Sequence, residues 1–387
     1  MNHNFSKTVD RRLTHSLKWE VEDDVLPMWV ADMDFEAAPA ITAALQKRLE
    51  QKIFGYDLVP EAYFEAYQSW WKRRYGEDIK KEWLMFCEGV VAAVSSIVRR
   101  VTNIGDNVLI QAPVYNIFYN SILNNGRHVL SSDLVYSEGR YEIDFDDLEA
   151  KLALPLTTMM ILCNPHNPVG KIWDDETLAK IGDLCDKHHV IVLSDEIHCD
   201  LTKPGKMYTP YASIHPHHSI TCMAPSKTFN IAGLKTSCIM VPDEDLRAIV
   251  ERGINTDEVA EPNSFAIDAT IAGYDESEDW LEELRLVIER NKQTVYAFIR
   301  EALPELYVVE GEATYLIWID CSKIEQDADQ LCDFLKKEAG LYVSEGSAYG
   351  PTGASFFRLN VACSQECLQE GLTRLKKGIT LYKERRI

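Results

Sequence analysis

Basic residues are scarce in this sequence, and long apolar stretches are absent. Among its 387 residues, 40 are Lys or Arg and 61 are Asp or Glu, which leaves a net charge of −21. A surface of this sign repels nucleic acid and anionic membranes, so we expect neither as a partner. The apolar stretches are too short to span a bilayer. Low-complexity tracts, internal repeats and Gly/Ser linkers are also missing, and 387 residues of which 46% are hydrophobic are enough for one large domain and a smaller one.

Closely paired cysteines are missing too. None of the ten cysteines forms a C-x-x-C pair, and the spacing of Cys and His does not resemble a zinc site, so we predict no bound metal. The first residues, Met1 to Lys7, contain no apolar segment of the kind found in signal peptides. We therefore expect a cytoplasmic protein with reduced thiols.

Short apolar runs alternate with amphipathic stretches through the middle of the chain. This alternation predicts an α/β fold in which a mostly parallel seven-stranded sheet lies between helices. The predicted strands are Trp83–Cys87, Asn107–Gln111, His128–Leu130, Thr158–Cys163, Val190–Ser194, Ile220–Met223 and Ser237–Val241. A typical intervening helix is predicted at Thr177–His188, where Leu178, Ile181, Leu184 and Cys185 are apolar.

The pattern changes near residue 285, where we predict a smaller α+β domain. Its predicted elements are a helix at Leu281–Leu303, a strand at Thr314–Asp320, a helix near Gln326–Glu338, a strand near Phe356–Val361 and a helix at Gln365–Arg385. The predicted division is an N-terminal segment at 1–45 that packs with the small domain, a large domain at 46–284 and the small domain at 285–387.

Polar side chains follow three of the predicted strands at the points where they end. Asp195 follows Val190–Ser194, Asn167 lies in the turn Asn-Pro-His-Asn-Pro after Thr158–Cys163, and Lys227 follows Ile220–Met223. Ligands of parallel sheets bind at the carboxyl ends of the strands, so we expect these side chains at one edge. Together they match the needs of pyridoxal phosphate: an amine for its aldehyde, an anion for its pyridine nitrogen and a donor for its phenolate oxygen.

Other residues suit the remaining parts of that cofactor. Tyr115, at a strand end, could stack on the ring, and His198, three residues after Asp195, could also face it. The turn at Gly89, with Val90 and Val91, could hold the phosphate at a helix N-terminus. Ser226 and Lys235 flank Lys227 and could assist there.

Arg358 completes the candidate site. It lies in an apolar strand, where a guanidinium needs a partner, and a substrate carboxylate would suit it.

Each of these residues also has an ordinary structural interpretation. Lys227 and Lys235 could be solvated lysines, Asp195 a helix cap and Asn167 a turn residue. Tyr115 could belong to the core, and Arg358 could form a structural salt bridge.

As a set, these residues resemble the fold-type-I pyridoxal-phosphate enzymes, the aspartate aminotransferase superfamily, over nearly the whole chain. The segments Pro27–Phe35, Phe54-Gly55-Tyr56, Asp195–Asp200 and Ser226–Asn230 resemble, more narrowly, the bacterial carbon–sulfur β-lyase branch. That branch contains cystathionine β-lyases, including the type that modulates the maltose regulon.

The resemblance implies a role for each residue. Lys227 would form the Schiff base and transfer protons, Asp195 would meet the ring nitrogen, and Asn167 the phenolate. Arg358 and Asn167 would hold the substrate carboxylate. The other implied roles are stacking for Tyr115, phosphate binding for Gly89, Val90, Val91, Ser226 and Lys235, a place near the ring for His198, and an entrance lined by Trp29, Ala31 and Asp32. Tyr56 would reach the phosphate of a second subunit, which implies a homodimer.

Two positions depart from the wider superfamily. Ala224 stands three residues before the lysine, where many members have a Ser or Thr that binds phosphate. His198 stands where aminotransferases commonly have Tyr, which agrees with the lyase branch.

The expected activity is β-elimination of cystathionine or cysteine-type substrates, which gives a thiol, pyruvate and ammonia. An aminotransferase is the alternative, because both reactions share their early steps. An additional regulatory role through protein binding is a further alternative.

Overall fold

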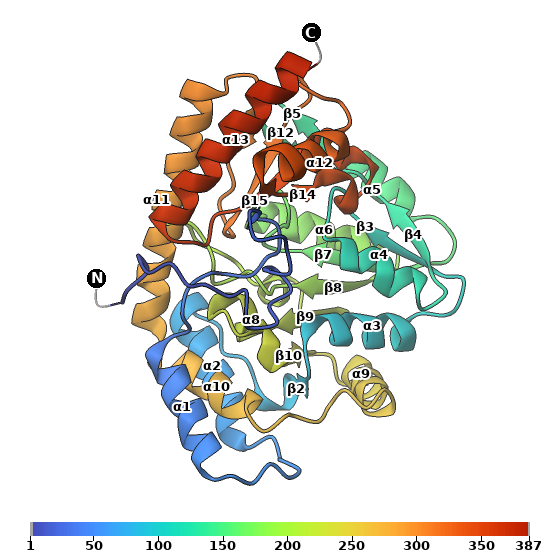
Figure 1. Ribbon diagram of the computed structural model, residues 1–387. Coiled ribbons are helices and arrows are strands. Elements are labelled where there is room, and N and C mark those ends of the chain that lie inside the picture. Colours follow the sequence, from blue (N-terminus) through green and yellow to red (C-terminus); the bar gives the residue numbers. More distant parts are fainter. Residues whose placement is uncertain (1–2, 386–387) are drawn as a thin grey trace.

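A seven-stranded sheet forms the centre of the computed structural model, which describes residues 3–385 (Figure 1). The strand order is β2-β10-β9-β8-β7-β3-β4. The bounds are β2 (Leu84–Cys87), β3 (Asn107–Ile110), β4 (His128–Ser131), β7 (Thr157–Cys163), β8 (Ile191–Asp195), β9 (Ser219–Met223) and β10 (Ser237–Met240). Only β10 pairs antiparallel, with β2 and with β9. The predicted mostly parallel seven-stranded sheet is therefore confirmed.

Helices cover both faces of this sheet, because successive strand residues point to opposite sides. Ile161 packs in one core with α3, α4 and α9, while the next residue, Leu162, packs in another with α5, α6 and α7. The helices are α1 (Pro39–Glu50), α2 (Glu61–Tyr75), α3 (Val90–Val101), α4 (Asn116–Leu123), α5 (Phe145–Leu152), α6 (Asp175–Lys187), α7 (Tyr211–Ile214), α8 (Pro225–Thr228), α9 (Glu244–Thr256) and α10 (Ala266–Glu276).

A second, four-stranded antiparallel sheet has the order β11-β12-β15-β14. Its strands are β11 (Tyr307–Val309), β12 (Leu316–Asp320), β14 (Ser344–Glu345) and β15 (Phe356–Asn360), and its core is shared with α11 (Glu278–Ala302), α12 (Ala328–Ala339) and α13 (Gln365–Arg385). The predicted strand Thr314–Asp320 begins two residues late, at Leu316, because Thr314 has a left-handed φ of +63°. Helix α11 begins three residues early, where acidic Glu278 and Asp279 suit its N-terminus.

The N-terminal segment contacts both parts of the molecule. Strand β1 (Leu26–Pro27) pairs with β13 (Leu341–Tyr342), and Met28 packs in the core beside α13. Met33 instead packs in the core of α1, α2 and α10. The predicted domain division at 1–45, 46–284 and 285–387 stays a prediction, and Met1 and Asn2 lie outside the described residues. Strands β5 (Val135–Ser137) and β6 (Arg140–Glu142) form a small antiparallel hairpin.

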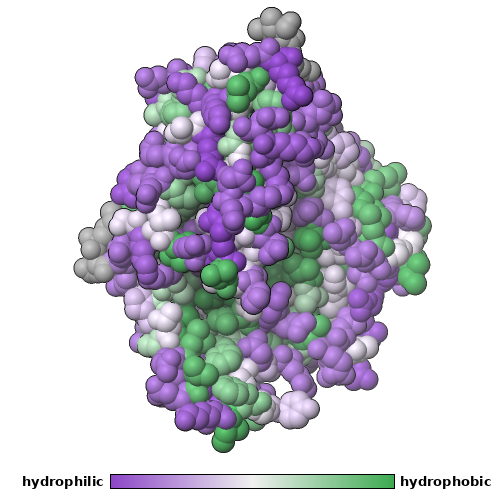
Figure 2. Space-filling model, in the orientation of Figure 1, coloured by the Kyte–Doolittle hydropathy of each residue, from purple (hydrophilic) through white to green (hydrophobic). Residues whose placement is uncertain are grey.

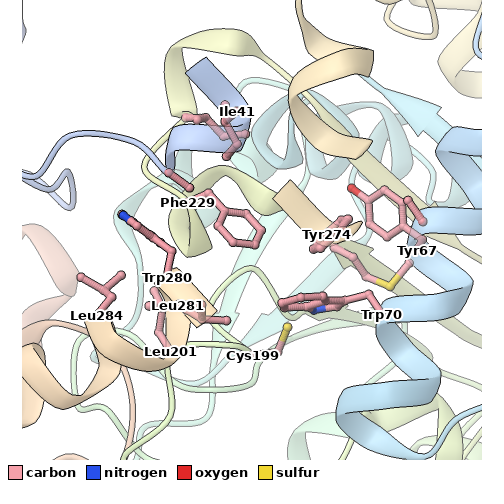
Figure 3. Packing of buried hydrophobic residues seen from close by; sticks show 14 of the residues in the cluster. Ile41, Tyr67, Trp70, Cys199, Leu201, Phe229, Tyr274, Trp280, Leu281 and Leu284 are labelled. Carbon is pink, nitrogen blue, oxygen red and sulfur yellow. The ribbon is translucent and has the colours of Figure 1, made fainter. Parts of the chain in front are cut away.

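An aromatic core lies directly beneath the turn that carries Lys227. Phe229, two residues later, is fully buried between Tyr274 and Trp280, with ring centroids 5.8 and 6.2 Å away (Figure 3). This packing fixes the backbone that follows Lys227.

All ten cysteines are buried and free. None of the helices in residues 3–385 combines the length and the apolar character that a bilayer crossing needs.

Candidate active site

Three neighbouring parallel strands bring the candidate residues to one edge of the large sheet. In the register of β7, β8 and β9, Asp195 lies between Cys163 and Cys222. The Asn164 amide donates to the Asp195 carbonyl at 3.0 Å, and the Glu196 amide donates to the Cys222 carbonyl at 3.0 Å. The three segments after these strands therefore begin side by side, as the sequence predicted.

A cavity of about 440 Å³ opens at this edge. The predicted residues that line it are Ala31, Gly89, Val90, Val91, Tyr115, Asn167, Asp195, His198, Ser226, Lys227 and Lys235. The part of the chain that the structure describes contains no group of three or more Cys, His, Asp or Glu that could hold a metal ion.

Lys227 lies in the short helix α8, and its Nζ donates a hydrogen bond to the Ala31 carbonyl at 2.6 Å. Burial lowers its pKa to about 8. Asp32 and Asp195 oppose this shift, while Arg358 and Lys235 add to it. A substantial fraction of the amine is therefore neutral near pH 8, as a nucleophile or a base requires.

Asp195 ends β8 with a buried carboxylate. Its Oδ1 accepts from the Ile197 amide at 3.1 Å, and burial raises its pKa to about 6, although Lys227 opposes the rise. Within residues 3–385, no cation lies within ion-pair distance of Asp195. Glu196 points away from the cavity, because its Oε1 accepts from Ser194 Oγ and from the Tyr211 amide.

Arg358 is buried on β15, and among the described residues it has no carboxylate partner. Its Nη1 donates to Asn167 Oδ1 at 3.0 Å, and its Nη2 donates to the Trp29 carbonyl at 2.9 Å. Its Nε is buried without a partner, and the guanidinium lies 4.9 Å from the ring centroid of Tyr349. The structural salt bridge that the sequence left open is thus not formed, and the charge is available to an anion.

His198 is a neutral group in this site. Burial, together with the charges of Lys227 and Arg358, lowers its pKa to about 3. Its Nδ1 is buried without a partner. Tyr115 stands at the N-cap of α4, and burial raises its pKa to about 12, so its phenol is protonated.

The first turns of α3 form part of the cavity wall. Gly89 has a φ of +147°, a conformation in which a side chain would be strained, and it precedes the first turn of the helix. Ser226 also lines the cavity, but its hydroxyl donates to the Thr236 carbonyl at 3.3 Å. Lys235 contributes a cation to the lining of the cavity.

Four predicted residues stand outside the cavity lining: Arg358, which reaches it through Asn167, and Tyr56, Asp32 and Trp29. Tyr56 is fully exposed, and within this chain it does not reach the cavity. The Asp32 carboxylate forms a two-bond ion pair with Arg11 at 2.9 and 3.1 Å. The Trp29 ring stacks on Tyr342 with ring centroids 4.8 Å apart, and the Trp29 carbonyl accepts a hydrogen bond from Arg358.

Sequence reasoning missed several residues of the lining: Glu88, Ala92, Val94, Ser95, Ile117, Phe118, Cys163, Ile197 and Ala232. Helical spacing could have found two of them. Ser95 follows Val91 by four residues, and Phe118 follows Tyr115 by three, so each pair shares a helix face.

Comparison with known proteins places this arrangement in a family. The model of aminotransferase class I and II matches residues 23–375, and the chain belongs to that family. The chain is 43% identical to cystathionine beta-lyase PatB of Bacillus subtilis over 386 residues, which cover 97% of this chain and 100% of PatB.

Two solved structures are similar over almost the full length. Cystalysin of Treponema denticola, which contains a pyridoxal 5'-phosphate cofactor, has a TM-score of 0.95 and 34% identity, and the match covers 98% of this chain and 99% of cystalysin. A pyridoxal-phosphate-bound C–S lyase of Staphylococcus hominis has a TM-score of 0.93 and 33% identity, with 98% of each chain covered. The predicted aspartate aminotransferase-like fold is confirmed.

Proposed function

We propose that this protein is a pyridoxal-phosphate-dependent carbon–sulfur β-lyase. It cleaves the Cβ–S bond of cystathionine or of cysteine-type substrates and gives a thiol, pyruvate and ammonia. The observation that carries the proposal is a set of three buried ionisable groups at or beside one cavity. Asp195 has no salt-bridge partner among the described residues, Arg358 has no carboxylate partner there, and Lys227 has a lowered pKa. Full-length similarity to PatB and to the C–S lyase of S. hominis supports the lyase class.

The residues present fit pyridoxal phosphate. Asp195 would pair with its ring nitrogen, which supplies the cation that this buried carboxylate lacks. Arg358 holds Asn167 Oδ1, so the Asn167 amide nitrogen is the atom left to donate to the phenolate oxygen. Tyr115 and His198 would lie against the ring, and neither carries charge near neutral pH.

The phosphate would lie at Gly89, Val90 and Val91, against the free amides of α3. Lys235 would neutralise part of its charge. Ala224 offers no hydroxyl, and Ser226 would have to turn its hydroxyl away from Thr236 to donate to the phosphate.

When bound, pyridoxal phosphate supplies an aldehyde for an amine and a ring that withdraws electrons from the substrate Cα. The protein supplies the rest. Arg358 binds the substrate carboxylate through Nε and a terminal nitrogen. Lys227 removes the Cα proton as a neutral amine and then returns a proton to the departing thiolate.

The test is product analysis with the cofactor-loaded protein. L-Cystathionine should yield pyruvate and homocysteine in equal amounts, and L-cysteine should yield pyruvate and hydrogen sulfide in equal amounts, while Lys227→Ala should yield none of these products. Formation of an amino acid from an added keto acid, without pyruvate, would instead identify an aminotransferase. The matching family is described as aminotransferase class I and II, so an aminotransferase is the second candidate.

We also propose a cytoplasmic homodimer. Ten buried free thiols suit a reducing compartment. Figure 2 shows apolar side chains over the centre and lower part of one face, where α1, α8 and α10 lie. Ile53, Phe54, Tyr56 and Leu58, just after α1, are largely exposed. In a dimer, Tyr56 would move from solvent to the phosphate of the second subunit. The dimer can be tested by measuring the mass of the protein in solution, and variants of Tyr56 or Leu58 should lose the dimer.

A further inference from the structure

The Ala31 carbonyl is the hydrogen-bond partner of Lys227, and other hydrogen bonds fix the backbone on both sides of Ala31. The Asp32 amide donates to the Val30 carbonyl at 2.9 Å, which closes a tight turn with Ala31 at its apex. Ala31 lines the cavity, and its carbonyl accepts from Lys227 Nζ at 2.6 Å. The turn therefore places one backbone acceptor at the amine.

Asn360 binds both sides of this turn. Its Nδ2 donates to the Val30 carbonyl at 2.6 Å and to the Asp32 carbonyl at 2.7 Å. Its Oδ1 accepts from the Ala362 amide at 2.8 Å. The opposite orientation of the amide would set an oxygen against two carbonyl oxygens, so the direction of the group is unambiguous.

The Asn360 amide has no donor to spare for a ligand. Both of its N–H groups serve the two carbonyls, and the side chain is buried at 1% exposure. It shares one face of β15 with Arg358, two residues earlier, whose Nη2 holds the Trp29 carbonyl. The strand thus holds three carbonyls of the segment 29–32 and leaves the Ala31 carbonyl to the lysine.

We propose that Asn360 is a positioning residue for Lys227. It fixes the turn at Ala31, and the turn aims the Ala31 carbonyl at the lysine amine. The acceptor stabilises the ammonium that forms when Lys227 takes the Cα proton, and it holds that ammonium in place for the departing sulfur. This inference rests on the proposed function for the identity of the reaction, but the contact itself does not.

A second buried asparagine offers a matched control. Asn291 on α11 donates through Nδ2 to the carbonyls of Val361 and Cys363, at 2.8 and 2.9 Å. It too joins two carbonyls two residues apart, and it is fully buried. It does not contact the segment 29–32 or the cavity lining. Asn360→Leu and Asn291→Leu therefore remove the same kind of contact, but only the first removes a contact to the turn at Ala31. Asn291 acts one step further away, since the residues that it holds flank Ala362, the donor to Asn360 Oδ1.

The first measurement is independent of turnover. Cofactor-free protein is mixed with pyridoxal phosphate from pH 6 to 10, and the rate at which the visible absorption band grows reports the neutral fraction of Lys227. Loss of an acceptor disfavours the ammonium, so Asn360→Leu should move the midpoint to lower pH by at least about half a unit. The charged groups that act on Lys227, namely Asp32, Asp195, Arg358 and Lys235, are unchanged in this variant.

The second measurement is steady-state thiol release with L-cystathionine. Asn360→Leu should lower kcat by about 10- to 100-fold with little change in KM, as a misplaced catalytic group does. Asn291→Leu should keep the midpoint of the wild type and lose less than about threefold in kcat. If Asn360→Leu does not fold, Asn360→Ala, which also removes both donors and adds no charge, replaces it with the same expectations.

Unchanged midpoint and kcat in the Asn360 variant would overturn the proposal, and so would equal shifts in both asparagine variants. If the wild type releases no thiol, the proposed lyase activity fails, while the pH midpoints still decide the role of Asn360.

Discussion

Arg358→Ala is the sharpest test of how the site holds its substrate. The guanidinium is buried: Nη1 donates to Asn167 Oδ1, a cavity residue, Nη2 donates to the Trp29 carbonyl, and Nε has no partner among the described residues. Its charge also lacks a counterion there. A substrate α-carboxylate supplies both the acceptor for Nε and the missing charge.

The expected loss follows from this burial. Removing one partner of a desolvated, hydrogen-bonded charge pair costs about 2–5 kcal/mol. That range corresponds to a fall in kcat/KM of about 30-fold to several thousand-fold. Since the carboxylate is bound equally before and during the reaction, most of the loss should appear as a higher KM.

The assay measures thiol release from L-cystathionine and from its analogue without the α-carboxylate. Wild type should prefer the intact substrate strongly, and Arg358→Ala should abolish the preference. Arg127→Ala is the control, because Arg127 is also buried but donates to Arg99 O and Thr102 O, outside the cavity. Equal use of both substrates by wild type, or a fall below threefold in the Arg358 variant, would refute the reasoning.

Three further predictions concern the cofactor and the core. Lys227→Ala should abolish the visible absorption of the loaded protein, and an unchanged spectrum would mean that another amine binds the aldehyde. Burial raises the Asp195 pKa to about 6, so this carboxylate gains a proton as pH falls from 7 to 5 and can no longer pair with a protonated ring. Affinity for pyridoxal phosphate, measured by titration, should weaken over that range in wild type, and Asp195→Asn should be weak at both pH values. Phe229→Ala should lower the free energy of unfolding of the cofactor-free protein by about 3–5 kcal/mol in urea, and a loss below about 1 kcal/mol would contradict the packing seen around this ring.

Much of the candidate site could be predicted because its residues follow strand ends. Asp195, Asn167 and Lys227 each stand just beyond a run whose apolar character marks a buried strand, and a parallel sheet brings such positions to one edge. Arg358 could be proposed as a carboxylate ligand because an arginine inside an apolar strand needs an anion. The structure removes the competing interpretation, since this arginine has no salt bridge among the described residues.

Other features depended on contacts between segments far apart in the chain. Asn360 and the turn at Ala31 are separated by about 330 residues, and no spacing rule connects them. Likewise, Asp32 was expected at the entrance, but its pairing with Arg11 could not be foreseen. Ser226 was expected to serve the phosphate, yet its hydroxyl is directed to Thr236.

The sequence by itself determined the α/β fold, the kinds of chemistry at the strand ends and the family, because hydrophobic period and residue type are local properties. Tertiary structure alone decided which of these side chains keep unmatched charges and which are satisfied by protein. Burial and hydrogen bonding set the pKa of Lys227 and Asp195 and leave Arg358 open to an anion. Those quantities depend on every neighbour that excludes water, and neighbours are set by how the whole chain packs.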